Sequence, residues 1–153
     1  TLVAQPAADK RKATNVRLMG TTNKTFKYSR INGTDNVIII RLAELYLIRA
    51  EARAAKSSPD LTGALADVNV IRARAGLDNS TSADAASILK DVYTERYWEF
   101  AHEGHAFFDY KRTGRLATAL TGFSGANAFR AVLPTPQREI INSAGKITQV
   151  TGY

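Results

Sequence analysis

The chain has 153 residues, of which 44% are hydrophobic, so it is long enough for one domain or for part of a larger fold. It contains no cysteine, which excludes disulfides, a thiol nucleophile and a lipidated cysteine within the chain. Lys and Arg outnumber Asp and Glu by 21 to 14, but acids stand near many of the basic residues and no basic run reaches five. This pattern favours a solvated mixed-charge surface, and we expect no nucleic-acid partner.

The first 36 residues form a polar segment with weak strand character at residues 16–19 and 25–31. This composition predicts a short hairpin or an extended arm over residues 1–36, followed by a helical domain over residues 37–153. The first residue is Thr1, and no basic segment leads into an apolar run. We therefore expect no signal peptide, and we expect the chain to be a piece of a longer protein.

From residue 37 the hydrophobic period changes to that of a helix. A helix with a broad buried face is predicted over about residues 37–55 from its apolar residues, which include Leu42, Leu45, Tyr46, Leu47, Ile48 and Ala52. Alanines at 43, 50, 52, 54 and 55 would allow a neighbouring helix to approach closely. Residues 37–48 come nearest to a membrane span, but two charged residues interrupt them, and a span needs about 20 apolar residues.

A second helix is predicted after the sequence SSPD. Ser58 is a suitable N-cap, Pro59 suits the first helical position, and Asp60 complements the helix dipole. The apolar residues of this helix are Leu61, Leu65, Val68, Ile71 and Ala75. Gly76 ends it, and the short connection predicts that the two helices are antiparallel neighbours. A single helix pair cannot bury both its faces, so part of the fold is expected to be missing.

A third helix is predicted over about residues 84–103. Its apolar stripe comprises Leu89, Val92, Tyr93, Arg96, Tyr97 and Phe100. Arg96 stands inside this stripe, so it either extends its charge to solvent or pairs with a buried acid.

The remaining elements are shorter. A helix is predicted at residues 106–113, closed by Gly114. Residues 121–130 read as a Gly-, Ser- and Asn-rich loop. A short helix opened by Thr135 and Pro136 follows, and the tail beyond it is irregular.

His102 and His105 raise the question of a metal site. A zincin helix places two histidines four residues apart, whereas these two are three apart with Gly104 between them. Because glycine favours the end of a helix, His105 does not continue the helical spacing. We therefore predict no metal site and no other cofactor.

Four motifs occur in a fixed order: RLAELYLIRAEA (41–52), NVIRARAGL (69–77), ERYWEFAHEGHAFFDYKRTG (95–114) and LPTPQREI (133–140), with GY at the end. In this order they resemble the C-terminal part of the SusD/RagB family over residues 25–153. The resemblance implies a mainly α, SusD-like C-terminal region. In it, a tetratricopeptide-like helix pair precedes further helices and irregular loops.

The resemblance also implies a function. Members of the family are non-catalytic lipoproteins on the outer membrane of Bacteroidetes that bind oligosaccharides or other nutrients during polysaccharide utilisation. They cap a SusC-like TonB-dependent transporter. The resemblance therefore implies an extracellular position on the outer membrane, reached through a lipid anchor outside this segment.

The resemblance also suggests a role for the charged residues of the motif at residues 95–114. The matching positions are Glu95, Arg96, Glu103, Gly104, Asp109, Arg112 and Gly114. Opposite charges around a helix end predict a hydrogen-bonded network that fixes a turn, an architectural role. Ala106 departs from the pattern, because the family often has arginine there. Arg112→Ala is predicted to destabilise the fold without changing ligand binding.

Three function classes remain open from the residues. For a nutrient-binding module, Trp98, Tyr97 and Tyr110 could hold sugars on their rings, although each also fits a core position. A helical interaction module would show a broad exposed apolar face. A retaining glycosidase would need two carboxyls about 5 Å apart, which Glu99 and Glu103 could supply, as could any helix with this spacing. No catalytic residue is predicted, and the ligand-binding residues remain unknown.

Overall fold

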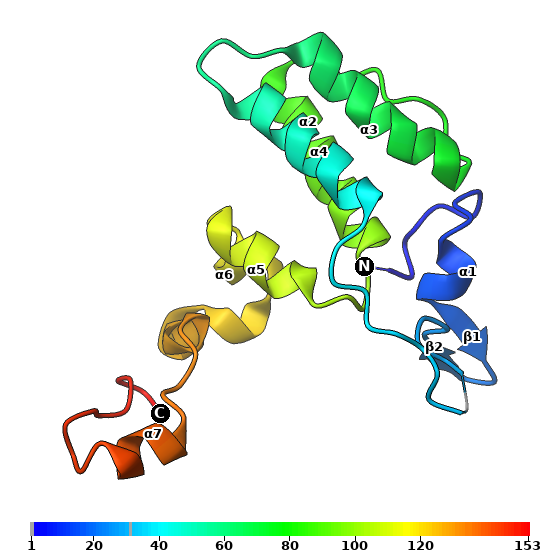
Figure 1. Ribbon diagram of the computed structural model, residues 1–153. Coiled ribbons are helices and arrows are strands. Elements are labelled where there is room, and N and C mark those ends of the chain that lie inside the picture. Colours follow the sequence, from blue (N-terminus) through cyan, green and yellow to red (C-terminus); the bar gives the residue numbers. More distant parts are fainter. Residues whose placement is uncertain (1, 31) are drawn as a thin grey trace. The chain divides into compact units, whose positions relative to one another are not determined.

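Helices dominate the structure, a computed structural model that describes residues 2–30 and 32–153 (Figure 1). Two compact units are present, one ending at His105 and the other formed by Ala106–Tyr153. The mainly α class expected from the sequence is confirmed, since the described residues contain one small sheet of two strands. The division predicted between residues 36 and 37 stays a prediction.

The N-terminal segment contains a short helix and a hairpin. Its elements are α1 (Lys12–Asn15), β1 (Arg17–Met19) and β2 (Thr22–Lys24). The strands are antiparallel, with Arg17 opposite Lys24. Gly20 has a φ of +61°, which a two-residue hairpin turn requires. The predicted hairpin is therefore present, but this early turn places its second strand before residues 25–31. Ile31 itself lies outside the described residues.

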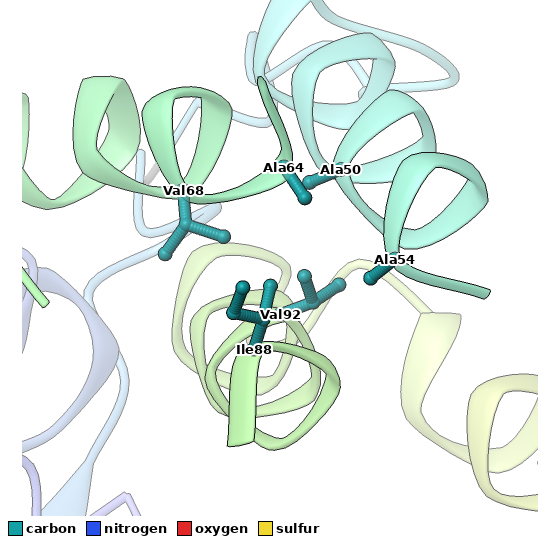
Figure 2. Close-up of a cluster of buried hydrophobic side chains, with 6 residues drawn as sticks. All are labelled: Ala50, Ala54, Ala64, Val68, Ile88 and Val92. Atoms are coloured by element: carbon teal, nitrogen blue, oxygen red, sulfur yellow. The ribbon is translucent and has the colours of Figure 1, made fainter. Parts of the chain in front are cut away.

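Three helices form the core of the first unit. They are α2 (Leu42–Ala55), α3 (Leu61–Ala75) and α4 (Ala85–Glu99). Each packs against the other two, and α2 and α3 run in opposite directions, as predicted (Figure 1). Small and β-branched side chains meet between them in one cluster, comprising Ala50, Ala54, Ala64, Val68, Ile88 and Val92 (Figure 2). Within the described part of the chain, no helix has the length and apolar character needed to cross a membrane.

The buried face of α2 agrees with the predicted one only in part. The helix starts at Leu42 instead of residue 37, because Arg41 is extended and the β-branched residues before it favour extended backbone. The buried residues of α2 are Ala43, Leu47, Ala50 and Ala54. Alanines let the neighbouring helices approach closely. Leu42 and Leu45, predicted to be buried, are therefore turned outward and are 67% and 50% exposed.

Ser58 was predicted to cap the N-terminus of α3, but the structure shows that Asp60 caps it instead. The Asp60 carboxylate accepts a hydrogen bond from the Gly63 amide at 2.9 Å. A Cβ atom on Gly63 would lie 2.2 Å from Asp60 Oδ2, so the cap needs glycine at this position. Gly76 ends the helix, as predicted, and the Leu77 amide donates to the Arg72 carbonyl at 2.9 Å beyond it.

The helix α4 is shorter than predicted. Asp84 caps it by accepting a hydrogen bond from the Ser87 amide at 2.9 Å. The helix ends at Glu99, and residues 100–104 form turns before α5 (His105–Arg112) begins. His102 has a φ of +64°, which a continuing right-handed helix does not allow. The predicted helical stretch to residue 103 was therefore wrong.

The second unit contains short helices. Beyond α5 they are α6 (Leu116–Ala119), η1 (Thr121–Phe123), η2 (Gly125–Ala131) and α7 (Gln137–Asn142). The predicted loop at residues 121–130 thus forms 3₁₀ turns. At the C-terminus, the Tyr153 hydroxyl donates to the Val132 carbonyl at 2.9 Å, and its ring meets Phe129 edge to face. A Cβ atom on Gly152 would lie 2.5 Å from Phe129 Cγ, which explains the terminal Gly-Tyr pair.

Candidate functional site

Three glutamates at the C-terminal end of α4 form the centre of the candidate site. Glu95, Glu99 and Glu103 follow one another at four-residue steps, and the first two lie on one face of α4. Glu95 is fully buried, and the side chains of Glu99 and Glu103 are 3% and 1% exposed. A buried carboxylate needs a hydrogen-bonded cation to remain charged, and each of these glutamates has at least two.

Glu99 is paired with three arginines. Arg11 Nη1 donates to Oε2 of Glu99 at 3.0 Å, while Arg41 and Arg74 both donate to Oε1. Burial would raise the pKa of Glu99, but the hydrogen bonds from Arg74 and Arg41 outweigh it and hold the pKa at about 2. The carboxylate is therefore a permanent anion at neutral pH.

Glu95 and Asp9 share Arg11. Arg11 Nη2 lies 2.8 Å from Glu95 Oε2 and 2.6 Å from Asp9 Oδ2, and Arg72 Nη1 donates to Glu95 Oε1 at 2.9 Å. Burial raises the pKa of Glu95 above its ordinary value, although both arginines act against it. For Asp9, the hydrogen bonds from Arg11 and Gln5 outweigh burial and lower the pKa.

Glu103 anchors the segment before α2. Lys27 Nζ donates to Glu103 Oε1 at 2.6 Å, and Arg41 Nη2 donates to the same oxygen at 3.1 Å. Lys27 also donates to the carbonyls of Glu99 and Ala101, at 3.2 and 3.0 Å. A cation at these last carbonyls complements the negative end of the α4 dipole.

An open cleft of about 430 Å³ lies beside this network, within the first unit. We call it the basic cleft. Its charged lining side chains are Lys10, Arg11, Lys27, Arg41, Arg74, Glu99 and Glu103. Five are cations and two are carboxylates, and the carboxylates are the more deeply buried. The cleft therefore presents positive charge to solvent.

The network explains part of the predicted pattern and corrects part of it. Glu95 and Glu103 are held in buried ion pairs with basic residues distant in sequence, whereas Arg112 bonds Asp109 within α5 at 2.9 Å. Arg96, only 5% exposed, lies against the Phe100 ring with its guanidinium carbon 5.1 Å from the ring centre.

The partners Arg41, Arg72 and Arg74 lie inside the motifs RLAELYLIRAEA and NVIRARAGL, so the family pattern could have identified them as partners of the glutamates. Arg11 and Lys27 lie in the polar N-terminal segment, where no local pattern marks them.

The two histidines make separate structural contacts. His102 Nε2 lies 3.0 Å from the Asn15 carbonyl, whereas His105 lies 3.6 Å from Glu44 and packs on the Phe100 ring. Among residues 2–30 and 32–153, no group of three or more potential ligands could hold a metal ion.

The candidate aromatic residues belong to both units, Trp98 and Tyr97 to the first and Tyr110 to the second. The Arg11 guanidinium carbon lies 5.9 Å from the centre of the Trp98 ring, so one side of that ring faces an arginine of the ion-pair network. Tyr97 is half-buried on α4. Tyr110 belongs to the second unit, where Arg115 lies over its ring at 5.3 Å.

Comparison with known proteins assigns these features to a family. The sequence model of the SusD family matches residues 3–153. SusD-like protein P25 of Formosa agariphila is 29% identical over 123 residues, which cover 72% of this chain and 23% of that protein. The chain therefore spans about a quarter of the length of this curated relative.

Solved structures agree with the family match. A SusD superfamily protein from Bacteroides vulgatus matches 99% of this chain with 27% identity and a TM-score of 0.68, over 37% of its own length. One from Parabacteroides distasonis reaches a TM-score of 0.78 with 21% identity over 99% of this chain and 41% of its own, a likeness of fold.

Proposed function

Because the chain belongs to the SusD family, we propose that it takes part in non-catalytic binding of glycan nutrients at the cell surface. The match of the family model to residues 3–153 is the observation that carries this proposal. The glycan would pass to a SusC-like TonB-dependent transporter of the outer membrane. A lipid anchor outside this segment would hold the protein at the extracellular face, and this segment would serve mainly as scaffold.

The scaffold role is supported by how the charged residues are used. Three buried glutamates bind basic residues of the N-terminal segment, of the end of α3 and of position 41, just before α2. These ion pairs fix one segment to another. Two of the aromatic candidates lie beside arginines of their own unit, Trp98 beside Arg11 and Tyr110 beside Arg115.

The same geometry supports a role without catalysis. A retaining glycosidase needs a carboxylic acid with a raised pKa beside a second carboxylate that reaches the substrate. The pKa of Glu99 is lowered to about 2, and Glu103 is held by Lys27 and Arg41. Glu95 has a raised pKa, but it is fully buried between arginines and cannot contact a glycan.

Native gels cast with a panel of neutral and acidic polysaccharides test the proposal. At least one glycan is expected to retard the longer protein that contains this segment, and the same mixture in solution is expected to release no reducing ends over hours. Release of reducing ends would overturn the non-catalytic assignment. Migration unchanged by every glycan would remove the support for glycan binding.

An exposed apolar face supports a second candidate, a helical module that binds another protein. The face runs from the extended segment onto α2 and comprises Val37, Ile39, Ile40, Leu42, Leu45 and Ile48. Ile39 is 85% exposed, and several large apolar side chains exposed within twelve consecutive residues are typical of a protein interface. If the chain uses this face, Ile39→Ser with Leu42→Ser should abolish association with a helical protein partner in sedimentation experiments, without changing retardation by glycans.

A further inference from the structure

We propose that the basic cleft holds the anionic group of an acidic glycan, either a carboxylate or a sulfate ester on a sugar ring. The inference rests on the proposed function, because it names the class of glycan that this segment would contact. It adds one subsite to a segment that is otherwise scaffold.

More positive than negative groups meet at Glu99. Three guanidinium groups, from Arg11, Arg41 and Arg74, bond a single carboxylate whose side chain is 3% exposed. Arg41 is shared with Glu103 and Arg11 with other acids, but Arg74 has no second carboxylate partner among the described residues. Arg74 is also 55% exposed, so its remaining N–H donors face the cleft and solvent.

Lys10 adds a second available cation at the cleft. Its amide donates to the Ala75 carbonyl at 2.9 Å, which fixes its backbone at the end of α3. Its side chain passes over Gly76, where an added Cβ atom would lie 2.9 Å from Lys10 Cε. Within the described residues no carboxylate pairs with the Lys10 ammonium, and Lys10 is among the residues that line the cleft. The fold thus gives the cleft an unneutralised cation in addition to Arg74.

The lining of the cleft discriminates between ligand classes. Its volume of about 430 Å³ is within the range typical of small-ligand sites, about 300–1,000 Å³. No aromatic ring is among its described lining residues, so a neutral sugar or a nucleobase finds no stacking surface there. A metal ion is disfavoured because cations surround both carboxylates. An anionic group could bind Lys10 and Arg74, and the hydroxyl groups of a sugar ring could bond to Thr14, which also lines the cleft.

Calorimetric titrations with matched ligands test this site. The probes are oligogalacturonate for the carboxylate, its methyl ester as the neutral control, and a sulfated galactan oligosaccharide with its desulfated form for the sulfate. An acidic probe of one type is expected to bind at least tenfold more tightly than its neutral counterpart. The affinity is expected to fall when the salt concentration rises.

Variants of the chain locate the binding. Lys10→Gln is expected to weaken binding of the acidic probe about fivefold, while Lys10→Arg retains it. Lys90→Gln removes another exposed charge, on α4, that is not among the described residues lining the cleft, and is expected to change nothing. Because Lys10 pairs with no buried carboxylate, both Lys10 variants should keep the melting temperature of the parent, so a loss of binding is not a loss of folding.

The possible results separate the two proposals. Equal affinity for acidic and neutral probes, or equal affinity of parent and Lys10→Gln, overturns the subsite but leaves glycan binding in place. Tighter binding of poly-glutamate than of any acidic glycan overturns glycan recognition and points to an acidic protein segment. No binding of any probe overturns the subsite, and the polysaccharide gels then decide the proposed function.

Discussion

Glu99 is the residue on which most of the first unit's ion pairs converge. Its carboxylate accepts from three guanidinium groups that come from the N-terminal segment, from the residue before α2 and from α3. The Glu99 side chain is almost fully buried, so water could not take the place of its carboxylate as the partner of these arginines. The carboxylate therefore holds together parts of the chain that are distant in sequence.

Replacing Glu99 with glutamine should be strongly destabilising. Breaking a buried pair leaves its partners uncompensated, which typically costs about 3–5 kcal/mol. Urea unfolding of parent and variant measures this cost. Asp78→Asn, an exposed acid on the same unit, is the matched control and should lie within about 0.5 kcal/mol of the parent. A variant as stable as the parent would contradict the anchoring role.

The stability should depend on pH through the same carboxylate. The pKa of Glu99 is about 2 in the folded chain, against an ordinary value of 4.5. Because the folded pKa is lowered, Glu99 contributes full stability above about pH 4.5 and loses it as the pH falls toward 2. The difference in unfolding free energy between parent and Glu99→Gln should therefore shrink by about 3 kcal/mol between pH 5 and pH 2.

This comparison isolates one group. The raised pKa of Glu95 acts in the opposite direction, but Glu95 is present in both proteins and its effect largely cancels. A difference that stays constant across this pH range would show that Glu99 does not titrate as proposed.

Arg112 should contribute much less than Glu99. Its guanidinium bonds Asp109 at 2.9 Å within α5, but the side chain of Arg112 is 43% exposed. A partly exposed pair at this spacing typically contributes about 0.5 kcal/mol. Arg112→Ala should lower the melting temperature slightly, leaving retardation by glycans unchanged, and Lys111→Ala on the same helix serves as control. Identical melting temperatures for both variants would refute this role.

At the scale of the elements, the start of α3 offers a test of coupling. Asp60→Ala should cost about 1 kcal/mol by removing the cap. Gly63→Ala should also destabilise the parent, because the new Cβ atom would lie 2.2 Å from Asp60 Oδ2. In the Asp60→Ala background the clash is absent, so the same change should stabilise the helix by up to about 1 kcal/mol.

Unfolding measured on the four proteins of this cycle gives the coupling directly. A coupling energy near zero would mean that Gly63 is not required by the cap.

The helices were predictable to the extent that their signals are local. The core-facing residues Val68 and Ile71 of α3 and the ending at Gly76 follow from helical spacing and helix-end chemistry. The buried face of α2 was predicted in part: Leu47 and three of the alanines are buried, whereas Leu42 and Leu45 are exposed. The alanines face the core because the closest approach of the helices requires small side chains.

At the scale of the whole molecule, the ion-pair network could be predicted only in part. Glu95 and Glu103 were recognised as architectural from their motif, in which Glu99 is not a matching position. Their partners Arg11 and Lys27 are 88 and 76 residues away from Glu99 and Glu103, respectively. Pairings at this separation depend on how the helices pack and leave no periodic or local signal in the sequence. For the same reason the basic cleft could not be foreseen.

Ion pairs to Glu95, Glu99 and Glu103 fix the N-terminal segment, and the proposed scaffold role depends on them. Hydrogen exchange of the Val16 and Phe26 amides, which donate to the carbonyls of Lys12 and Thr14, measures this most directly. Both amides should exchange far more slowly than unstructured peptide in the parent, and much faster in Glu99→Gln. Unprotected amides in the parent, or equal protection in both proteins, would contradict the claim.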